Sequence, residues 1–244
     1  MYKLLWPEKI DTKEVLKEAA DFFGCSLKEV TNDWADYTAF TNANKYPKLL
    51  GELKTLNTLE SFFVFLGMKL FNPDAIYEIG THVGKSTRRM IDFNKSFGFN
   101  KPITCFDIMD IVKYFKKPEV KFVIKDITNT IKENIIDKTD TGLIYLDAHP
   151  YDITLNCIKE VLKTKDWTLV IHDCGKHLCN PKMKIRKDEP EKITSLTGHW
   201  ERYVLAEAFG ISDQLSTDLD YVETDTHKMK IFNTMHGICV ILPK

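Results

Sequence analysis

The chain of 244 residues has no uninterrupted apolar run long enough to cross a membrane. Its most apolar stretch, residues 59–71, contains Glu60 and Lys69, whereas a membrane-spanning helix needs about 20 predominantly apolar residues. Residues 1–8 also lack the apolar segment of a secretory signal peptide. We therefore expect a cytoplasmic protein that does not enter a membrane.

An excess of either charge is absent as well. The 34 basic and 35 acidic residues give a net charge of −1, so no overall electric field attracts nucleic acid or an anionic membrane. The sequence has no internal repeat and no low-complexity segment. Its six cysteines are scattered rather than spaced as in a small disulfide-stabilised domain. These absences agree with a soluble enzyme in a reducing compartment, and they leave a homo-oligomer open.

Short apolar segments that end in an acidic residue follow one another along the chain. Each is followed by a helix-compatible or loop segment, which is the alternation typical of an open parallel sheet. Ligands of such sheets bind beyond the carboxyl ends of the strands. A single acid in this position could simply cap the next helix, but the ordered series predicts one shared site. The segments are residues 75–79, 102–107, 120–126, 142–149 and 167–173, and their acids are Glu78, Asp107, Asp126, Asp147 and Asp173.

The turn after the first segment has the composition of a cofactor-binding loop. Gly80 and Gly84 allow the backbone to approach a ligand where a Cβ atom would clash. Ser86 and Thr87, with the free N–H groups of the following helix, could bind an anionic group. Glu78 would repel a phosphate, so the loop suits a ligand with cationic or hydroxyl groups better than a polyphosphate.

Two common nucleotide-binding motifs fit this turn poorly. The dinucleotide motif G-x-G-x-x-G requires a glycine at position 82, which is His82. The P-loop motif G-x-x-x-x-G-K-[ST] matches at Gly84-Lys85-Ser86, but its first glycine would fall on Ile79. A P-loop-type nucleotide-binding enzyme is therefore only a weaker alternative.

Residues 78–87, with the sequence EIGTHVGKST, resemble motif I of class I S-adenosylmethionine-dependent methyltransferases. The form E-I-G-T-x-x-G-x-S-T is similar to that of small-molecule O-methyltransferases related to the catechol and macrolide-sugar enzymes, and the likeness extends over residues 72–244. Asp107 could accept both hydrogen bonds of a ribose diol, and the resemblance places Asp126 near the adenine amino group. The resemblance implies that S-adenosylmethionine contacts Glu78, Gly80, Thr81, Gly84, Ser86, Thr87, Asp107, Ile108, Asp126, Ile127 and Asp147.

The strand pattern and the resemblance predict an α/β fold: a Rossmann-like, seven-stranded, mostly parallel sheet with helices on both faces and an antiparallel last strand. Residues 1–71 are expected to form an N-terminal helical cap and residues 72–244 the methyltransferase domain, with a substrate-side loop at 174–197. A polar-aromatic loop at residues 37–46 is expected to line the pocket. Helices are expected at 11–23, 26–37, 49–70 and 199–209, and the last strands at 220–223, 228–232 and 238–242.

The segment LDAHPYD at residues 146–152 resembles the I-D-G-x-H-x-Y motif of metal-dependent O-methyltransferases. By this resemblance Asp147 and Asp173 are metal ligands, and two carboxylates completed by waters and substrate hydroxyls suit Mg²⁺. The metal would lower the pKa of a bound hydroxyl, and His149, with a pKa of about 6–7, would remove its proton. The predicted reaction is O-methylation of a small hydroxylated molecule.

Two departures from that motif leave alternatives open. Cys174 stands where the relatives place a second acid or amide, and His149 follows Asp147 by two residues rather than three. Transfer without a metal, with Asp147 and His149 alone orienting and deprotonating the acceptor, is one alternative. A catalytically inactive protein that only binds a ligand or partner is another. The segment His172-Asp173-Cys174, with His177 and Cys179, could also bind zinc, although the C-x2-H-x-C spacing matches no structural zinc module well.

Overall fold

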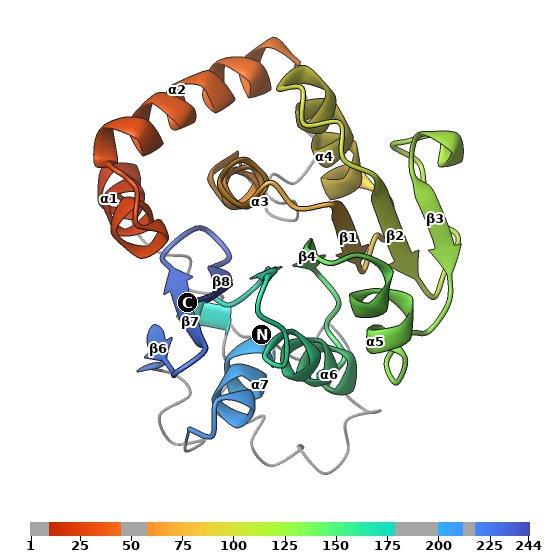
Figure 1. Cartoon of the computed structure of the whole chain (residues 1–244). Coiled ribbons are helices and arrows are strands. Elements are labelled where there is room, and N and C mark those ends of the chain that lie inside the picture. The colour runs from red at the N-terminus through yellow and green to blue at the C-terminus, as the bar shows by residue number, and fades with distance from the viewer. Residues whose placement is uncertain (1–9, 45–57, 179–199, 212–217) are drawn as a thin grey trace, which may run out of the picture.

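The computed structural model describes residues 10–44, 58–178, 200–211 and 218–244 (Figure 1). They form an α/β structure around one sheet, whose strands are β1 Ala75–Ile79, β2 Ile103–Asp107, β3 Lys121–Ile124, β4 Gly142–Leu146, β5 Trp167–Ile171, β6 Tyr221–Glu223, β7 His227–Phe232 and β8 Ile238–Pro243. The spatial order is β3-β2-β1-β4-β5-β8-β7-β6. The predicted fold class is confirmed with one correction, since the sheet has eight strands rather than seven. The eighth strand is the short β6, at the segment 220–223 where a strand was expected, and it pairs with β7 at the edge of the sheet.

The strand directions place a ligand-binding edge beside β1. Strands β1 to β5 are parallel to one another, whereas β8 runs antiparallel to both of its neighbours, as predicted for the last strand. β1 has β2 on one side and β4 on the other, so the order of the strands reverses there. Ile79 and Leu146 pair at the carboxyl ends, and the segments beginning at Gly80 and Asp147 therefore start side by side. Ligands of open α/β sheets bind at this switch point.

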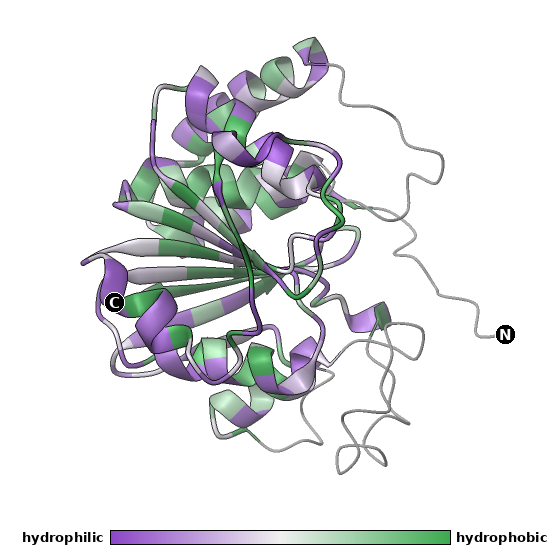
Figure 2. Ribbon diagram, turned by 90° about the vertical axis from the view of Figure 1, so that its right-hand side faces the viewer, coloured by the Kyte–Doolittle hydropathy of each residue, from purple (hydrophilic) through white to green (hydrophobic). Residues whose placement is uncertain are grey.

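The central strands are apolar because helices cover both faces of the sheet. All five residues of β1, β4 and β5 are buried. Alternate side chains enter two separate apolar clusters, so that Tyr77 and Ile79 face one helical layer and Ile76 faces the other. Figure 2 shows the sheet between the two layers, with apolar residues along its strands.

Two groups of helices cover the sheet in the described part of the chain (Figure 1). One layer contains α1 Thr12–Phe23, α2 Leu27–Ala43, α3 Thr58–Phe71 and α4 Lys85–Ser96, and the other contains α5 Ile131–Asn134, α6 Tyr151–Val161 and α7 Glu201–Ala208. Short 3-10 helices are η2 Lys117–Glu119, η3 Ile136–Lys138 and η4 Lys176–Leu178. No helix among these residues is long and apolar enough to cross a membrane. The division into a cap, residues 1–71, and a methyltransferase domain stays a prediction.

Local signals in the sequence define the ends of the first two helices. The Asp11 carboxylate accepts hydrogen bonds from two backbone N–H groups at the start of α1, and Gly24, with a φ of 72°, ends that helix. Ser26 and Glu29 form a capping box at the start of α2. In the same layer, Phe62, Phe63 and Leu66 of α3 are fully buried and belong to the apolar cluster that includes residues of β4, β5 and β8. The helices predicted at 11–23 and 26–37 are confirmed.

The predicted pocket-lining loop at residues 37–46 is wrong where the structure describes it, because α2 continues to Ala43. Tyr37 is completely buried, its hydroxyl donates to the Ser61 hydroxyl (2.8 Å), and its ring centroid lies 5.0 Å from that of Phe65. Packing of these aromatic rings in the core favours a continued helix over an open loop. Tyr46, the first half of the helix predicted at 49–70, and residues 179–197 of the predicted substrate-side loop lie outside the described residues.

Candidate active site

Asp147 and Asp173 lie together at the carboxyl edge of the sheet. Asp147 directly follows β4, and Asp173 is the second residue after β5. Because β4 and β5 are adjacent and parallel, the two carboxylates approach each other. With His149 they offer three donor atoms that all lie within 4.8 Å of one another. The structure thus brings together the two predicted metal ligands and the predicted base.

The turn that carries Asp173 is strained and engages Cys174 elsewhere. Asp173 has a φ of 61°, a left-handed conformation that costs free energy for any residue with a Cβ atom. The next backbone N–H, that of Cys174, donates to the Gly237 carbonyl (2.9 Å) in the turn between β7 and β8. The Cys174 thiol is buried and contacts the carbonyl oxygen of Ile171 at 3.7 Å. The side chain that replaces an expected metal ligand is therefore already engaged inside the protein.

His172 lies against both acids. Its Nδ1 atom is 3.1 Å from the Asp147 Oδ1 atom and 3.2 Å from the Asp173 Oδ1 atom. The ring is buried, and its Nε2 atom is 3.2 Å from the Oε2 atom of Glu60. Burial alone would lower the pKa of His172, but the surrounding acidic groups raise it well above its usual value.

Glu60 comes from α3 and reaches this edge of the sheet with no exposed surface. Its Oε1 atom accepts hydrogen bonds from the Thr234 hydroxyl (2.9 Å) and the His236 backbone N–H (2.6 Å). Its Oε2 atom faces His172 and the His236 Nδ1 atom, the latter at 3.1 Å. Burial would raise the pKa of Glu60, but the hydrogen bonds from the two imidazoles outweigh it and hold the pKa well below its ordinary value. Glu60 is therefore a buried carboxylate anion.

His149 lies on the more open side of the two acids. Its Nδ1 atom is 3.1 Å from the Oε1 atom of Glu201, a buried residue of α7, and its Nε2 atom is 3.7 Å from the Asp173 Oδ2 atom. Burial would lower the pKa of His149, but the hydrogen bond and negative charge of Glu201 outweigh this effect and raise the pKa to about 9. The predicted titration near 6–7 is therefore wrong, because the sequence did not reveal that Glu201 contacts the ring.

The two glycines of the first turn are required by the protein itself. A Cβ atom on Gly80, which has a φ of 90°, would lie 2.5 Å from the backbone oxygen of Asp147. A Cβ atom on Gly84, with a φ of 86°, would lie 2.6 Å from the ring of Phe115. Both glycines are therefore needed for close approach to neighbouring protein atoms, and their contact with a cofactor stays a prediction. Glycine at position 80 lets β1 and β4 end side by side.

Glu78 is completely buried behind the turn. The hydroxyl groups of Ser86 and Thr87 both donate hydrogen bonds to its carboxylate. Burial raises the pKa of Glu78 to about 7, although those two hydrogen bonds oppose the shift. The two hydroxyls that could have bound an anionic ligand are thus engaged with an acid of the protein.

Asp107 is held at the end of β2 by two backbone groups. Its Oδ2 atom accepts from the His82 N–H (2.6 Å) and its Oδ1 atom accepts from the Met109 N–H (2.9 Å). The following apolar side chains are exposed, Ile108 by 68% and Met109 by 49%. A carboxylate next to exposed apolar side chains combines an acceptor for hydroxyl groups with a surface for a flat ring. The hydrogen bond from the His82 N–H joins Asp107 directly to the glycine turn.

The remaining predicted cofactor contacts lie at different depths. Asp126 is exposed, and one of its carboxylate oxygens accepts from the Thr128 N–H (2.9 Å), which lowers the pKa of Asp126. Ile127 is 1% exposed and belongs to the apolar cluster under α5 and α6. Thr81 is buried, with its hydroxyl 3.3 Å from the Phe106 carbonyl oxygen. As cofactor contacts, these residues stay predictions.

Four residues of this site were not identified as site residues from the sequence. Glu60 had counted only as an interruption of an apolar run, and His172 only as a member of a weak zinc pattern. An acid in the middle of a buried helix requires partners, so Glu60 was the available signal for a polar cluster. Nothing in the local sequence indicates that Glu201 and His236 join them. The contacts of both depend on segments more than 50 residues away.

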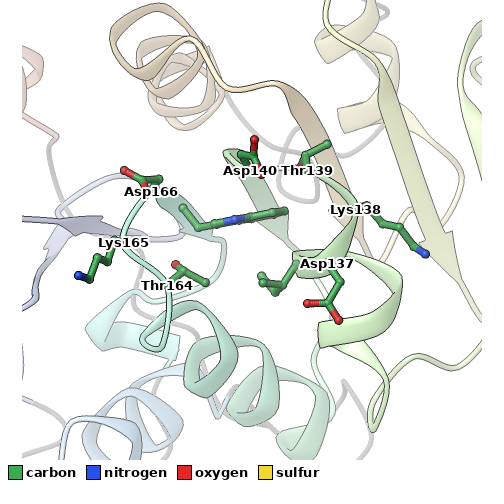
Figure 3. A pocket seen from close by; sticks show the side chains of 9 residues that line it. Asp137, Lys138, Thr139, Asp140, Thr164, Lys165 and Asp166 are labelled. Atoms are coloured by element: carbon green, nitrogen blue, oxygen red, sulfur yellow. The ribbon is translucent and has the colours of Figure 1, made fainter.

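A hollow at the opposite edge of the sheet is separate from this site. It has a volume of about 410 Å³ and is lined by residues 136–140 and 164–167 (Figure 3). Those residues precede β4 and β5, whereas Asp147 and Asp173 follow the same strands. Because ligands of open α/β sheets bind at the carboxyl ends, the hollow is not the predicted binding site.

The weaker motif interpretations gain no support from these contacts. In a P-loop the serine hydroxyl would contact a metal, but the Ser86 hydroxyl donates to Glu78. The Lys85 ammonium lies 5.7 Å from the ring centroid of Tyr114. In the zinc pattern, the Cys174 thiol is buried against backbone carbonyls, and Cys179 lies outside the described residues.

Comparisons with known proteins find similarity in structure but not in sequence. No protein-family model matches the chain, and no curated protein matches it. An O-methyltransferase of Bacillus cereus in complex with S-adenosylhomocysteine is 11% identical, with 87% of this chain and 91% of that chain covered and a TM-score of 0.52. A Klebsiella pneumoniae protein provisionally described as an O-methyltransferase is 11% identical, with 87% and 90% covered and a TM-score of 0.50.

A third similar structure is a methyltransferase of Podospora anserina with S-adenosylhomocysteine bound. It is 16% identical, covers 98% of this chain and 99% of that chain, and has a TM-score of 0.48. At these identities the comparisons concern the fold. The two structures with TM-scores of 0.52 and 0.50 support one statement. The chain has the fold of class I S-adenosylmethionine-dependent methyltransferases.

Proposed function

We propose that the protein is an S-adenosylmethionine-dependent methyltransferase that methylates a hydroxyl group of a small molecule. The observation that carries this proposal is the convergence of Asp147, His149 and Asp173 at the switch point of a methyltransferase fold. A cluster of acids with an imidazole suits the deprotonation of a hydroxyl. The fold alone would not support a reaction, because activity depends on the residues at the site.

The residues around the glycine turn fit S-adenosylmethionine. Asp107 already has both carboxylate oxygens held in place by backbone N–H groups, and each oxygen retains a lone pair for a ribose hydroxyl. The exposed side chains of Ile108 and Met109 offer an apolar surface beside it for the adenine ring. When bound, the cofactor supplies a methyl group on a positively charged sulfur. The acids at the carboxyl edge favour a ligand of that charge over a polyphosphate.

The residues on the acceptor side fit a divalent cation. The carboxylates of Asp147 and Asp173 are hard oxygen donors that suit such an ion, and Tyr145 donates a hydrogen bond to the Asp147 Oδ2 atom (3.3 Å). When bound, the cation would lower the pKa of the acceptor hydroxyl. His149 would accept the released proton at Nε2, because its Nδ1 atom is held by Glu201.

The binding-only alternative has one observation in its favour. With a pKa of about 9, His149 carries a proton at neutral pH, and a protonated imidazole cannot act as a base. An inactive protein of this fold would bind S-adenosylhomocysteine but transfer no methyl group. An active enzyme would form S-adenosylhomocysteine from S-adenosylmethionine when given an acceptor.

Calorimetric titration with S-adenosylmethionine, S-adenosylhomocysteine and ATP tests the proposal. We expect both adenosyl ligands to bind and ATP to bind much more weakly. Formation of S-adenosylhomocysteine in the presence of a panel of small catechols and sugars then separates an enzyme from a binding protein. Tighter binding of ATP than of S-adenosylhomocysteine would refute the assignment of the cofactor.

A further inference from the structure

We infer that His172 is the third protein ligand of the cation site, that Glu60 holds its ring in the ligating tautomer, and that the site takes a transition-metal ion such as Mn²⁺ in preference to Mg²⁺. This inference rests on the cation site of the proposed function. It assigns roles to two buried residues that neither the sequence motif nor the fold comparison identifies.

The first argument is the spacing of the donor atoms. The Nδ1 atom of His172 lies 3.1 Å and 3.2 Å from one carboxylate oxygen of Asp147 and one of Asp173. Bonds of about 2.1 Å at right angles to one ion separate neighbouring donors by about 3 Å. The imidazole nitrogen therefore lies where a third ligand of the same ion belongs. His149 is less suited to this role, because its Nε2 atom is 3.7 Å from Asp173 and its side chain is 34% exposed.

The second argument is the buried carboxylate on the far side of the ring. Histidine ligands of metals commonly donate their other N–H group to a carboxylate, which fixes the tautomer and the ring orientation. The Nε2 atom of His172 lies 3.2 Å from Glu60, which has no exposed surface. An N–H group at Nε2 leaves the lone pair of Nδ1 directed toward Asp147 and Asp173. In the absence of an ion, a proton on Nδ1 can occupy the same place.

The orientation of the Glu60 carboxylate is itself determined. Its Oε1 atom accepts from two donors, the Thr234 hydroxyl and the His236 backbone N–H. In a Glu60→Gln variant these donors would keep the amide oxygen at that position, so the NH₂ group would face His172. The NH₂ group would donate to Nε2 and move the ring proton to Nδ1. A protonated Nδ1 atom cannot bind a metal, so the charge-neutral substitution reverses the tautomer.

The donor set determines the preferred ion. Mg²⁺ favours oxygen ligands and near-ideal octahedral geometry, whereas imidazole nitrogen suits divalent transition metals. The His172 imidazole also has three carboxylates around it, and their negative charge favours the binding of a cation. Two carboxylates and one imidazole therefore predict tighter binding of Mn²⁺ than of Mg²⁺, and the difference should depend on His172.

The test uses the full chain after removal of metal with a chelator. Titration with MnCl₂ and MgCl₂ gives the two affinities, and electron spin echo envelope modulation of the Mn²⁺ form detects a coordinated ¹⁴N nucleus. We expect ¹⁴N modulation in the native protein and in a His149→Asn variant. We expect its loss in His172→Asn and Glu60→Gln, together with at least a tenfold weaker affinity for Mn²⁺ and a smaller change for Mg²⁺.

Two control variants make the measurement specific. His82→Asn removes an exposed imidazole from the glycine turn, and His236→Asn removes the other ring that faces Glu60. Both should keep the ¹⁴N modulation. Its loss in His236→Asn would place the ion among Glu60, His172 and His236 instead, and its loss in His149→Asn would identify His149 as the ligand. Either result overturns the inference, as does unchanged modulation in both His172→Asn and Glu60→Gln.

Failure of this inference can be distinguished from failure of the proposed function. Mn²⁺ bound by the native protein without ¹⁴N modulation would exclude an imidazole ligand but keep the cation site. If His172→Asn does not fold, as judged by circular dichroism, Glu60→Gln gives the same test without altering the ring. Binding of S-adenosylhomocysteine is a separate measurement that does not depend on the ion.

Discussion

Glu60 and His172 are 112 positions apart in the sequence, yet their Oε2 and Nε2 atoms lie 3.2 Å apart. Glu60 belongs to α3, which precedes the first strand, and His172 follows β5. The contact therefore joins a helix of one layer to the carboxyl edge of the sheet. Removing either partner would take one compensating contact from a buried charge, which is more costly than losing an exposed ion pair. Helix α3 thus contributes directly to the candidate active site.

Replacing Gly80 with alanine should destabilise the protein through the backbone of the neighbouring strand. The new Cβ atom would lie 2.5 Å from the Asp147 oxygen at a φ of 90°. We expect a loss of more than about 2 kcal/mol in the free energy of unfolding, measured with urea. Gly210→Ala is the matched control, because its φ is 67° but nothing lies within 4 Å of the added atom. Its cost should be about 1 kcal/mol from backbone strain alone, and equal losses in the two variants would contradict the role of the Asp147 contact.

Glu78 should make the stability of the protein fall as the pH rises toward 7. Burial raises the pKa of Glu78 in the folded state from 4.5 to about 7, so between these values the folded state binds more protons than the unfolded state. The contribution of Glu78 to the free energy of unfolding is then fully present below pH 4.5 and decreases by up to about 3 kcal/mol as the pH passes through 7. The neutral Glu78→Gln variant should lose this component and should exceed the native protein in stability at pH 8.

Chemical denaturation of the native protein and the variant from pH 4.5 to pH 8 measures the effect. Glu133→Gln, at an exposed position of α5, is the control for a general change in charge. Parallel pH profiles for the native protein and Glu78→Gln would contradict burial as the cause.

The sequence predicted the strands well because parallel strands covered on both faces are continuous apolar runs. The acids at their ends located the carboxyl edge, and Asp147 and Asp173 meet there as the adjacent strands require. Helix ends were predictable where caps are local, as at Ser26 and Gly24. The segment at Tyr37 was mistaken for a loop because polar and aromatic residues alternate in it, and only the tertiary aromatic core shows why it is helical.

The contacts that Glu60, Glu201 and His236 make in the site could not be predicted, because they join distant segments of the chain. The pKa of His149 depends on Glu201, which is 52 residues away, and Glu60 meets His236 across 176 residues. Periodicity and motif spacing carry no information about such pairs. At the glycine turn the sequence indicated a close approach at Gly80, but it did not reveal that the backbone after β4 makes such an approach.

Replacing Asp107 with alanine should weaken the binding of S-adenosylhomocysteine. The substitution would remove two hydrogen bonds from the ribose hydroxyls to a charged acceptor, with a cost of about 2–4 kcal/mol or roughly 30- to 1000-fold in affinity. Isothermal titration calorimetry measures the change. Asp110→Ala is the control, because that acid lies three residues away and pairs with Lys117 at the surface. Equal affinities for Asp107→Ala and the native protein would exclude the ribose contact.

Replacing His149 with alanine should reduce turnover without affecting the cofactor. We expect a rate lower by roughly 10²- to 10⁴-fold and nearly unchanged affinity for S-adenosylhomocysteine, since the imidazole would contact the acceptor. Glu201→Gln should lower the rate by a smaller factor, because it weakens the hydrogen bond that orients the ring. Glu207 lies on the same helix but accepts a hydrogen bond from Tyr151, so Glu207→Gln is the control. A native rate in His149→Ala would assign the proton transfer to another group.

Removing divalent cations should separate the two accounts of methyl transfer. If a cation held by Asp147 and Asp173 activates the acceptor, excess chelator should abolish formation of S-adenosylhomocysteine, and added Mn²⁺ or Mg²⁺ should restore it. Asp147→Asn should lose cation affinity and turnover together, whereas Asp140→Asn, which lies before β4 at the opposite edge of the sheet, should lose neither. Full activity in excess chelator would instead favour transfer in which Asp147 and His149 alone orient and deprotonate the acceptor by proximity. In that case Asp147→Asn should still reduce turnover, because its carboxylate would hold the acceptor directly, and the affinity for Mn²⁺ would be unrelated to the rate.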